Sequence, residues 1–188
     1  MNALPNAKLS PESVFMLRDG RPLRISPVTP AARPLIEKAI AGLSPESSRR
    51  RFFTVRYRLS DRELDALTHL DGRDRYALGA TVIRPEGGLE GVGVARFVRV
   101  ADSPSVAEVA VLVVDAYQGQ GVGKALLMRL SAAGAVRGIN RFRGIVLPDN
   151  MPMLALLRKH ASGGAMSRSD GLINFDVPLT AGFAAATH

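Results

Sequence analysis

Residues 107–127 read AEVAVLVVDAYQGQGVGKALL, and this stretch decides what the fold must contain. An apolar run with one acid, Glu108, predicts a strand, and a short polar turn leads from it into a glycine-spaced segment, residues 118–123, that opens a helix. Glycines let a backbone approach a ligand closely, and the free N–H groups of a helix start point at an anion. The sequence therefore predicts a diphosphate-binding turn between a strand and a helix.

Two other glycine-rich nucleotide motifs do not match this turn. A P-loop needs Ser or Thr after Gly-Lys, whereas Gly123-Lys124 is followed by Ala125. A dinucleotide-binding fingerprint needs Gly-x-Gly-x-x-Gly and an acid about 20 residues later. The glycines at 119, 121 and 123 break that spacing, and Asn140-Arg141 stands where the acid would be. Nucleotide hydrolysis and hydride transfer are therefore disfavoured, and a purely structural tight turn remains the alternative.

The length of 188 residues predicts one domain, and 46% hydrophobic residues agree with a globular protein. Cysteine is absent, which excludes disulfides and thiolate chemistry. The three histidines, His69, His160 and His188, show no ligand spacing, so we expect no metal site. No apolar run reaches the roughly 18 residues of a membrane span, and the N-terminus does not resemble a signal peptide. We expect a cytoplasmic protein that does not enter a membrane.

The formal net charge of +8 invites a nucleic-acid interpretation. The arginines are scattered, however, and only residues 49–51 form a cluster, without the interleaved aromatic residues of a base-stacking surface. A solvated arginine-rich surface is therefore expected, and nucleic-acid binding is not. Such a surface would also attract a polyanionic ligand or an acidic protein partner.

The order of predicted elements indicates an α+β protein with a mixed sheet flanked by helices. Residues 1–20 are expected to form an N-terminal arm, 21–180 the domain and 181–188 a tail. The capping-box match Ser60-Asp61-Arg62-Glu63 predicts the start of one helix. Strands are expected at 22–28, 76–84, 91–100, 106–114, 142–147 and 172–177, and helices at 29–43, 44–53, 60–67, 121–136 and 150–159.

The spacing Gln-x-x-Gly-x-Gly resembles the acetyl-CoA signature of the GNAT superfamily of N-acetyltransferases, and the chain is similar to that family from about residue 23 to 177. Within it, the segments LSPESSRRRFF, AEVAV and LPDNMPM resemble bacterial Pat-type protein-lysine acetyltransferases, notably the mycobacterial ones. The resemblance implies the GNAT fold, with a mixed, mostly antiparallel sheet. Mycobacterial members carry a cyclic-nucleotide-binding domain before the acetyltransferase domain. Only about 20 residues precede the expected domain in this sequence, so regulation by a cyclic nucleotide is not expected.

The resemblance also implies where acetyl-CoA, as co-substrate, would bind. The pyrophosphate is expected on the backbone N–H groups of the turn, and the pantetheine arm against the preceding strand, with an amide near the thioester carbonyl to stabilise the oxyanion. Glycine at 121 and 123 is expected to avoid collision. The expected residues are Val111, Leu112 and Val113 for the arm and Gln118, Gly119, Gln120, Gly121, Val122, Gly123 and Lys124 for the pyrophosphate.

Glu108 is the candidate general base. A lysine ammonium has a pKa of about 10.4, and only the neutral amine attacks a thioester. Glu108 alternates onto one strand face with Ala110 and Leu112, so we expect partial desolvation, which would favour proton uptake. The matching acid is the proposed base in Pat-type proteins. The alternative is a strand-end glutamate in water or in a salt bridge with Arg96 or Arg99.

Asn150 begins the helix after LPD, where the family often has an asparagine that contacts the cofactor arm; helix capping is the equal alternative. Seven residues later the family commonly has a tyrosine as general acid for the thiolate, but here Leu157 stands. His160 is a weak substitute, and water can protonate a CoA thiolate.

Three functions follow from this reading. The first is acetylation of lysines in other proteins, such as metabolic enzymes, and the second is acetylation of a small amine. The third is acyl-CoA binding without catalysis, which the missing tyrosine favours and the retained Glu108 disfavours. The oligomeric state does not follow from the sequence.

Overall fold

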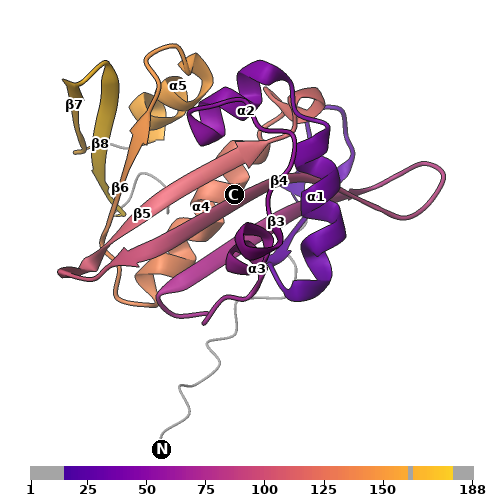
Figure 1. The fold of residues 1–188 in the computed structure, drawn as a ribbon, viewed down its shortest axis with the longest axis horizontal. Coiled ribbons are helices and arrows are strands. Elements are labelled where there is room, and N and C mark those ends of the chain that lie inside the picture. Colours follow the sequence, from indigo (N-terminus) through magenta and orange to yellow (C-terminus); the bar gives the residue numbers. More distant parts are fainter. Residues whose placement is uncertain (1–14, 161–162, 180–188) are drawn as a thin grey trace, which may run out of the picture.

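The computed structural model describes residues 15–160 and 163–179. In this part of the chain, eight strands form one sheet in the order β1-β2-β3-β4-β5-β6-β8-β7 (Figure 1). The strands are β1 (Phe15–Met16), β2 (Pro22–Pro27), β3 (Arg75–Ile83), β4 (Leu89–Val100), β5 (Ser103–Val113), β6 (Arg141–Val146), β7 (Ala165–Ser169) and β8 (Leu172–Pro178). All neighbours pair antiparallel except β5 and β6. The predicted mixed, mostly antiparallel sheet is confirmed.

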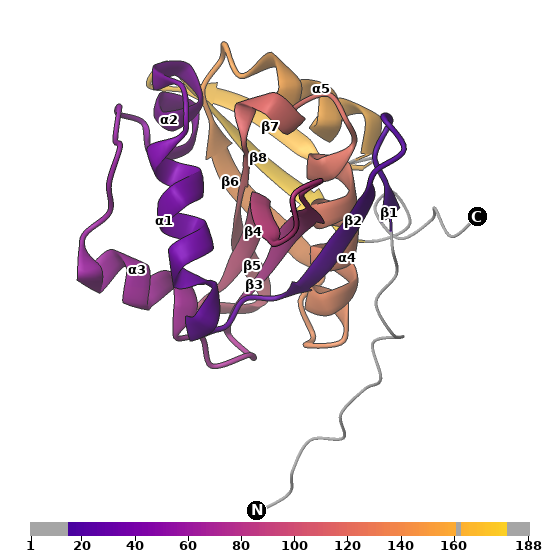
Figure 2. The ribbon, with the colours of Figure 1, turned by 90° about the vertical axis from the view of Figure 1, so that its right-hand side faces the viewer.

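Helices cover both faces of this sheet (Figure 2). One face carries α1 (Arg33–Ala41), α2 (Pro45–Phe52) and α3 (Asp61–Thr68), and the other carries α4 (Val122–Ala135) and α5 (Met151–His160). Short 3-10 turns, η1 (Pro30–Ala32) and η2 (Asp115–Tyr117), precede α1 and the glycine turn. Two apolar cores result, one on each side of the sheet.

The larger core lies between the sheet and helices α4 and α5. Leu126 and Leu130 of α4 are fully buried against Phe97 of β4 and Phe142 of β6. The smaller core joins Ile40 of α1 and Leu64 of α3 to the opposite face of the sheet. Burying side chains of this size contributes about 1.5–3 kcal/mol each relative to exposure. Alternate residues of β4 and β5 therefore pack into the two cores and stabilise the helices on both faces of the sheet.

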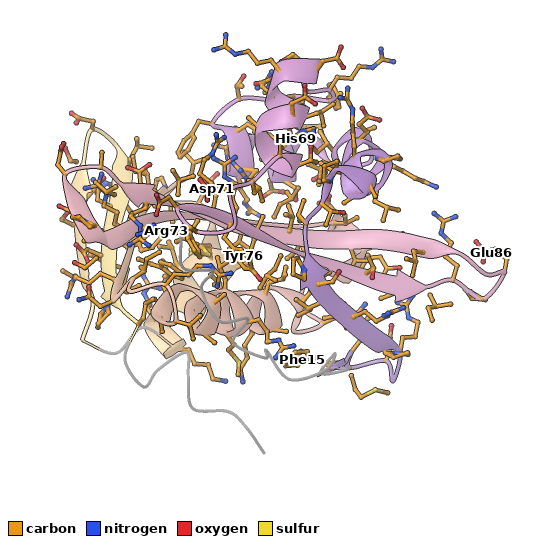
Figure 3. The ribbon with its side chains drawn as sticks, turned by 90° about the horizontal axis from the view of Figure 1, so that it is seen from below. Phe15, His69, Asp71, Arg73, Tyr76 and Glu86 are labelled. Atoms are coloured by element: carbon orange, nitrogen blue, oxygen red, sulfur yellow. The ribbon has the colours of Figure 1, made fainter. Side chains whose placement is uncertain are left out.

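Local signals in the sequence predicted most of these elements. Ser60 and Glu63 form a complete capping box at the start of α3, and Ser44 caps α2 by accepting from the Ser47 N–H at 3.1 Å. The turn at 85–88 joins β3 and β4 in a long hairpin, whose tip carries Glu86 away from the body of the molecule (Figure 3). The three predicted middle strands and the helices are confirmed within a few residues.

The sequence reading missed two strands. Residues Phe15–Met16 pair with Pro22–Leu23, so the sheet begins inside the segment expected to be an arm. All five residues of β7 are exposed, so no apolar alternation indicated that strand. Residues 1–14 of the expected arm and the expected tail at 181–188 lie outside the described residues. In the described part of the chain, no helix is long and apolar enough to cross a membrane.

Candidate active site

Strands β5 and β6 are neighbours that pair over only three residues. Val106–Glu108 pair with Arg141–Arg143, and no pairing joins the two strands beyond that point, although β5 continues to Val113 and β6 to Val146. The separated part opens into a cavity of about 1180 Å³. Glu108 therefore lies at the closed end of a gap in the sheet.

The cavity collects residues from widely separated parts of the chain. Helix α2 forms one wall, β5 and β6 form the sides of the gap, and the glycine turn and the start of α5 complete the opening. Among its lining residues are Ser47, Arg50, Arg51, Arg96, Glu108, Val111, Val113, Gly119, Gly121, Lys124, Arg143, Gly144, Asn150, Met153 and Lys159.

The edge of β5 presents main-chain groups to the gap at alternate residues. Val114 donates its N–H to the Val92 carbonyl at 3.0 Å, so this pair is hydrogen-bonded across β4 and β5. Because hydrogen-bonded pairs alternate in an antiparallel ladder, Leu112, opposite Val94, also directs its main-chain groups to β4. Val111 and Val113 direct theirs to the gap. The main chain of Leu112 therefore cannot bond the pantetheine arm, which corrects the expected contact. The side chain of Leu112 is part of the smaller core.

The register between β4 and β5 is continuous from Gly93 to Arg99, so no bulge interrupts β5 beside the gap. One of the gap-facing groups is already occupied, since the Gln118 side-chain amide donates to the Val113 carbonyl at 3.2 Å. The groups free to bond a ligand arm are then those of Val111 and the N–H of Val113.

The glycine turn has a backbone shape that other residues adopt with difficulty. Gly119 has φ +74° and Gly121 has φ +95°, and Gly121 precedes α4 without any side-chain cap. A Cβ at Gly121 would meet no protein atom, so its backbone conformation, rather than crowding within the protein, requires glycine. At Gly123 a Cβ would make only ordinary contacts, the nearest at 3.6 Å to Val113.

The N–H groups at this turn form a cluster of unused donors. Those of Gly119, Gln120 and Gly121 make no backbone hydrogen bond within the described chain, and those of Val122, Gly123 and Lys124 lie in the first turn of α4. Gln118 is an exception, because its N–H donates to the Asp115 carbonyl at 3.1 Å. The expected contact from the Gln118 backbone is therefore corrected.

Helix α2 is tied to this turn through one carboxylate. Asp115 accepts from the Ser44 N–H at 3.0 Å and from the hydroxyls of Ser44 and Ser47 at 2.6 and 2.7 Å. Burial opposes ionisation of Asp115, yet the hydrogen bonds from both serines outweigh it and lower its pKa. Gln118 adds a bond to the Ser47 hydroxyl at 2.9 Å. The network fixes the turn relative to α2, and sequence patterns gave no sign of it.

Glu108 is exposed rather than desolvated. Its side chain retains 62% of its accessible surface, and its Oε1 accepts from Arg143 Nη2 at 2.9 Å. The expected partial desolvation is therefore wrong: at Glu108 the strands β5 and β6 are still paired, and the side chain projects from the face of the sheet into solvent. Neither arginine considered from the sequence is the partner: Arg99 binds Asp74 at 2.6 Å, and Arg96 makes no ion pair in the described chain.

Asn150 caps α5, since its Oδ1 accepts from the Met153 N–H at 3.2 Å. It also lines the cavity, so the capping role leaves its amide group available there. Leu157 is only 1% exposed and belongs to the larger core, so the position expected for an acid does not face the cavity. The side chain of His160 lies outside the described part of the structure.

The three clustered arginines have different environments. Arg49 pairs with Asp149, and Arg50 pairs with Glu46 and donates to the Asp149 carbonyl at 3.1 Å. Arg51 is half-buried and lines the cavity. The expectation of a wholly solvated cluster is therefore wrong for Arg51 and also for Arg50, whose side chain is only 19% exposed. Within the described residues, no group of three or more His, Asp or Glu side chains is arranged to hold a metal ion.

The sheet and its helices have the fold of the GNAT acetyltransferases, as a match to a solved GNAT domain shows. The family model "Acetyltransferase (GNAT) family" matches residues 46–161. The chain belongs to this family.

Two relatives make the comparison more specific. Acetyltransferase Pat of Mycolicibacterium smegmatis is 34% identical over 145 residues, which is 75% of this chain and 41% of the relative. The crystal structure of the GNAT domain of S. lividans PAT matches with a TM-score of 0.79 and 35% identity, over 89% of this chain and 96% of that one.

A cAMP-binding acyltransferase from Mycobacterium smegmatis matches with a TM-score of 0.64 and 27% identity, over 94% of this chain and 50% of that one. The chain thus spans about 41% of the curated relative and half of this solved structure. Within the GNAT family, the chain is similar to the Pat proteins.

Proposed function

We propose that this protein transfers the acetyl group of acetyl-CoA to the ε-amino group of lysines in other proteins, with Glu108 as general base. The observation that carries the proposal is the gap between β5 and β6, which has Glu108 at its closed end and the free N–H groups of the α4 start at its open end. A thioester laid along the gap with its pyrophosphate on the turn would bring its reactive carbonyl toward Glu108.

The glycine turn suits the pyrophosphate. Up to six N–H donors, from Gly119 to Lys124, lie in one short segment, and the dipole of α4 favours negative charge at that end. The Lys124 side chain lines the same cavity and adds a positive charge. The free main-chain groups of Val111 and the Val113 N–H would bond the pantetheine arm in the manner of an added strand. An N–H of this edge near the thioester would stabilise the oxyanion.

The chemical step needs one proton acceptor. The lysine amine attacks the thioester carbonyl carbon, a C–N bond forms, and the C–S bond breaks as the tetrahedral intermediate collapses. The proton of the amine passes to Glu108 directly or through water. Arg143 occupies Oε1 of Glu108, and no bond to Oε2 is present in the described chain, so that oxygen is available. The thiolate takes its proton from water, because Leu157 supplies none.

A protein acceptor is supported by the position of Glu108 and by the relatives. Its carboxylate is exposed, so a lysine on a protein surface can reach it. Both Pat relatives are similar to this chain over most of this domain. A small amine is the alternative acceptor.

The experiment that tests this proposal incubates the protein with labelled acetyl-CoA and a bacterial lysate in which deacetylases are inhibited. Discrete labelled protein bands that disappear with Glu108→Gln would support the proposal. Unlabelled proteins together with label on small amines would replace it by the alternative, and intact acetyl-CoA binding without any transfer would indicate a binding protein.

A further inference from the structure

Two arginines of the cavity, Arg51 of α2 and Arg96 of β4, lie together without an anionic partner. Both line the large cavity, and both also border a small space between α1, α2 and the sheet whose other walls are almost entirely apolar. Within residues 15–160 and 163–179, neither guanidinium makes a hydrogen bond or an ion pair. Within the described residues, the one aromatic ring that the Arg51 guanidinium contacts is that of Phe52, whose centroid lies 5.0 Å away.

Both guanidinium groups lie where burial and a nearby positive charge disfavour their charged form. Burial, and then the nearby charge of Arg96, lower the pKa of Arg51 to about 10. Burial, and then the charge of Arg75, lower the pKa of Arg96. Half-buried like charges without counterions are costly, and an anion between them would remove most of that cost.

The acids that line the cavity do not supply this anion. Glu108 is paired with Arg143 at 2.9 Å, and Asp176 is paired with Arg141 at 2.6 Å. A guanidinium binds a carboxylate through two parallel hydrogen bonds, which makes a pair of arginines a specific site for that group.

The position of Arg96 in the sheet indicates which molecule brings the carboxylate. Arg96 lies opposite Ala110, and Val98 lies opposite Glu108, so Arg96 is the diagonal neighbour of Glu108 on the same face. Diagonal neighbours have their Cβ atoms about 7–8 Å apart. Arg96 also lies across β5 from the gap that would hold the thioester. A group bound to the arginines is therefore beside the attacking amine and away from the cofactor gap.

We propose that Arg51 and Arg96 form a carboxylate-binding subsite for the acceptor, which selects amines that carry a carboxylate close by, such as a lysine followed by Asp or Glu. This inference rests on the proposed function, since it assigns the acceptor side of the same cavity. Because the arginines bind the carboxylate beside the lysine, the subsite also lets this positively charged protein attract a segment that contains a cationic lysine.

The test uses two fluorescent hexapeptides with one lysine, followed either by aspartate or by asparagine. Rates with acetyl-CoA and binding by fluorescence anisotropy are measured for the unmodified protein and for Arg51→Gln, Arg96→Gln and Arg96→Lys. Arg73→Gln, at an arginine whose side chain is 74% exposed, is the matched control. A glutamine can occupy either half-buried site without leaving a charge, and melting temperatures verify folding.

If the subsite is correct, kcat/KM should be about tenfold or more higher for the aspartate peptide than for the asparagine peptide, through a lower KM. Hydrogen bonds to charged groups stabilise a complex enough to give a difference of this size. Each glutamine variant should abolish the preference, so that kcat/KM becomes equal for the two peptides. Arg96→Lys should retain part of it, and Arg73→Gln all of it. Equal binding and equal rates for the two peptides would overturn the subsite.

Two further arms separate the sources of a carboxylate. The rates with a free amino acid and with its amide are compared to test a small acceptor. A preference for the free amino acid that depends on Arg96 would retain the subsite. The rates with succinyl-CoA and acetyl-CoA are compared to test whether the carboxylate belongs to the acyl group. A preference for succinyl-CoA that depends on Arg96, together with equal rates for the two peptides, would overturn the assignment to the acceptor. Arg96-dependent binding of the aspartate peptide without any transfer would retain the subsite and reject the proposed function.

Discussion

Glu108 of β5 and Arg143 of β6 form an ion pair at the last position where the two parallel strands are joined, with 2.9 Å between Oε1 and Nη2. The pair holds the carboxylate at the closed end of the gap and leaves its Oε2 without a partner in the described chain. A side chain in open water would have no such fixed position. The structure thus gives Glu108 a defined orientation although it remains exposed.

The first prediction concerns this carboxylate. Glu108→Gln keeps the size of the side chain and removes the proton acceptor, so kcat should fall about 100-fold or more, within the range of general base catalysis. Acetyl-CoA affinity, measured by calorimetry, should stay within about twofold, because the turn is not altered. The remaining rate should rise with pH as more lysine becomes neutral. An unchanged kcat would remove Glu108 from the mechanism.

The second prediction concerns the backbone of the glycine turn. Gly121→Ala forces a Cβ onto a residue with φ +95°, which costs about 1–2 kcal/mol or shifts the backbone. Acetyl-CoA should bind about tenfold or more weakly, because the N–H groups lose their alignment. Gly87→Ala is the matched control, with φ +90° at the tip of the β3–β4 hairpin. Equal affinity in the two variants would mean that the turn does not hold the pyrophosphate.

The sequence predicted the parts of the fold that depend on local signals. Alternation of apolar residues defined the hairpin strands, and Ser60 with Glu63 defined the start of α3. The glycine spacing predicted the turn before α4, where Gly119 and Gly121 do have positive φ. It could not predict β7, because a strand whose residues are all exposed carries no apolar period.

The details of the candidate site depend on contacts between distant residues. Arg143 reaches Glu108 only because β6 pairs beside β5, and Leu112 turns its main chain away from the gap only because of its register with β4. The half-buried position of Arg51 depends on the packing of α2 over the sheet. A single sequence contains no direct signal for any of these relationships.

The third prediction concerns Asp115, which accepts three hydrogen bonds from α2. Asp115→Ala leaves the buried Ser47 hydroxyl without its carboxylate partner, so the free energy of unfolding should fall by about 1–3 kcal/mol. Acetyl-CoA affinity should fall as well, because Gln118 shares this network with the turn. Urea unfolding and calorimetry measure the two effects. Asp102→Ala, in the exposed β4–β5 turn, is the control; a loss of the same size there would contradict the assigned role.

The last prediction concerns stability in acid. Glu63 binds Arg56 through both oxygens and accepts from Ser60, and these bonds, with Arg56 first, lower its pKa from 4.5 to about 2. Between these values the unfolded chain binds a proton that the folded chain does not. The contribution of Glu63 to stability is therefore complete above about pH 5 and is lost as the pH falls toward 2.

Urea unfolding at pH 7, 5 and 3 tests this prediction in the unmodified protein and in Glu63→Gln. The variant should be less stable at pH 7, and the difference between the two proteins should shrink at pH 3, because protonation then removes the same charge from both. Added salt should also reduce the difference at pH 7, since the ion pair is partly exposed. A difference that is the same at all three pH values would show that the Glu63 carboxylate acts through its shape and not through its charge.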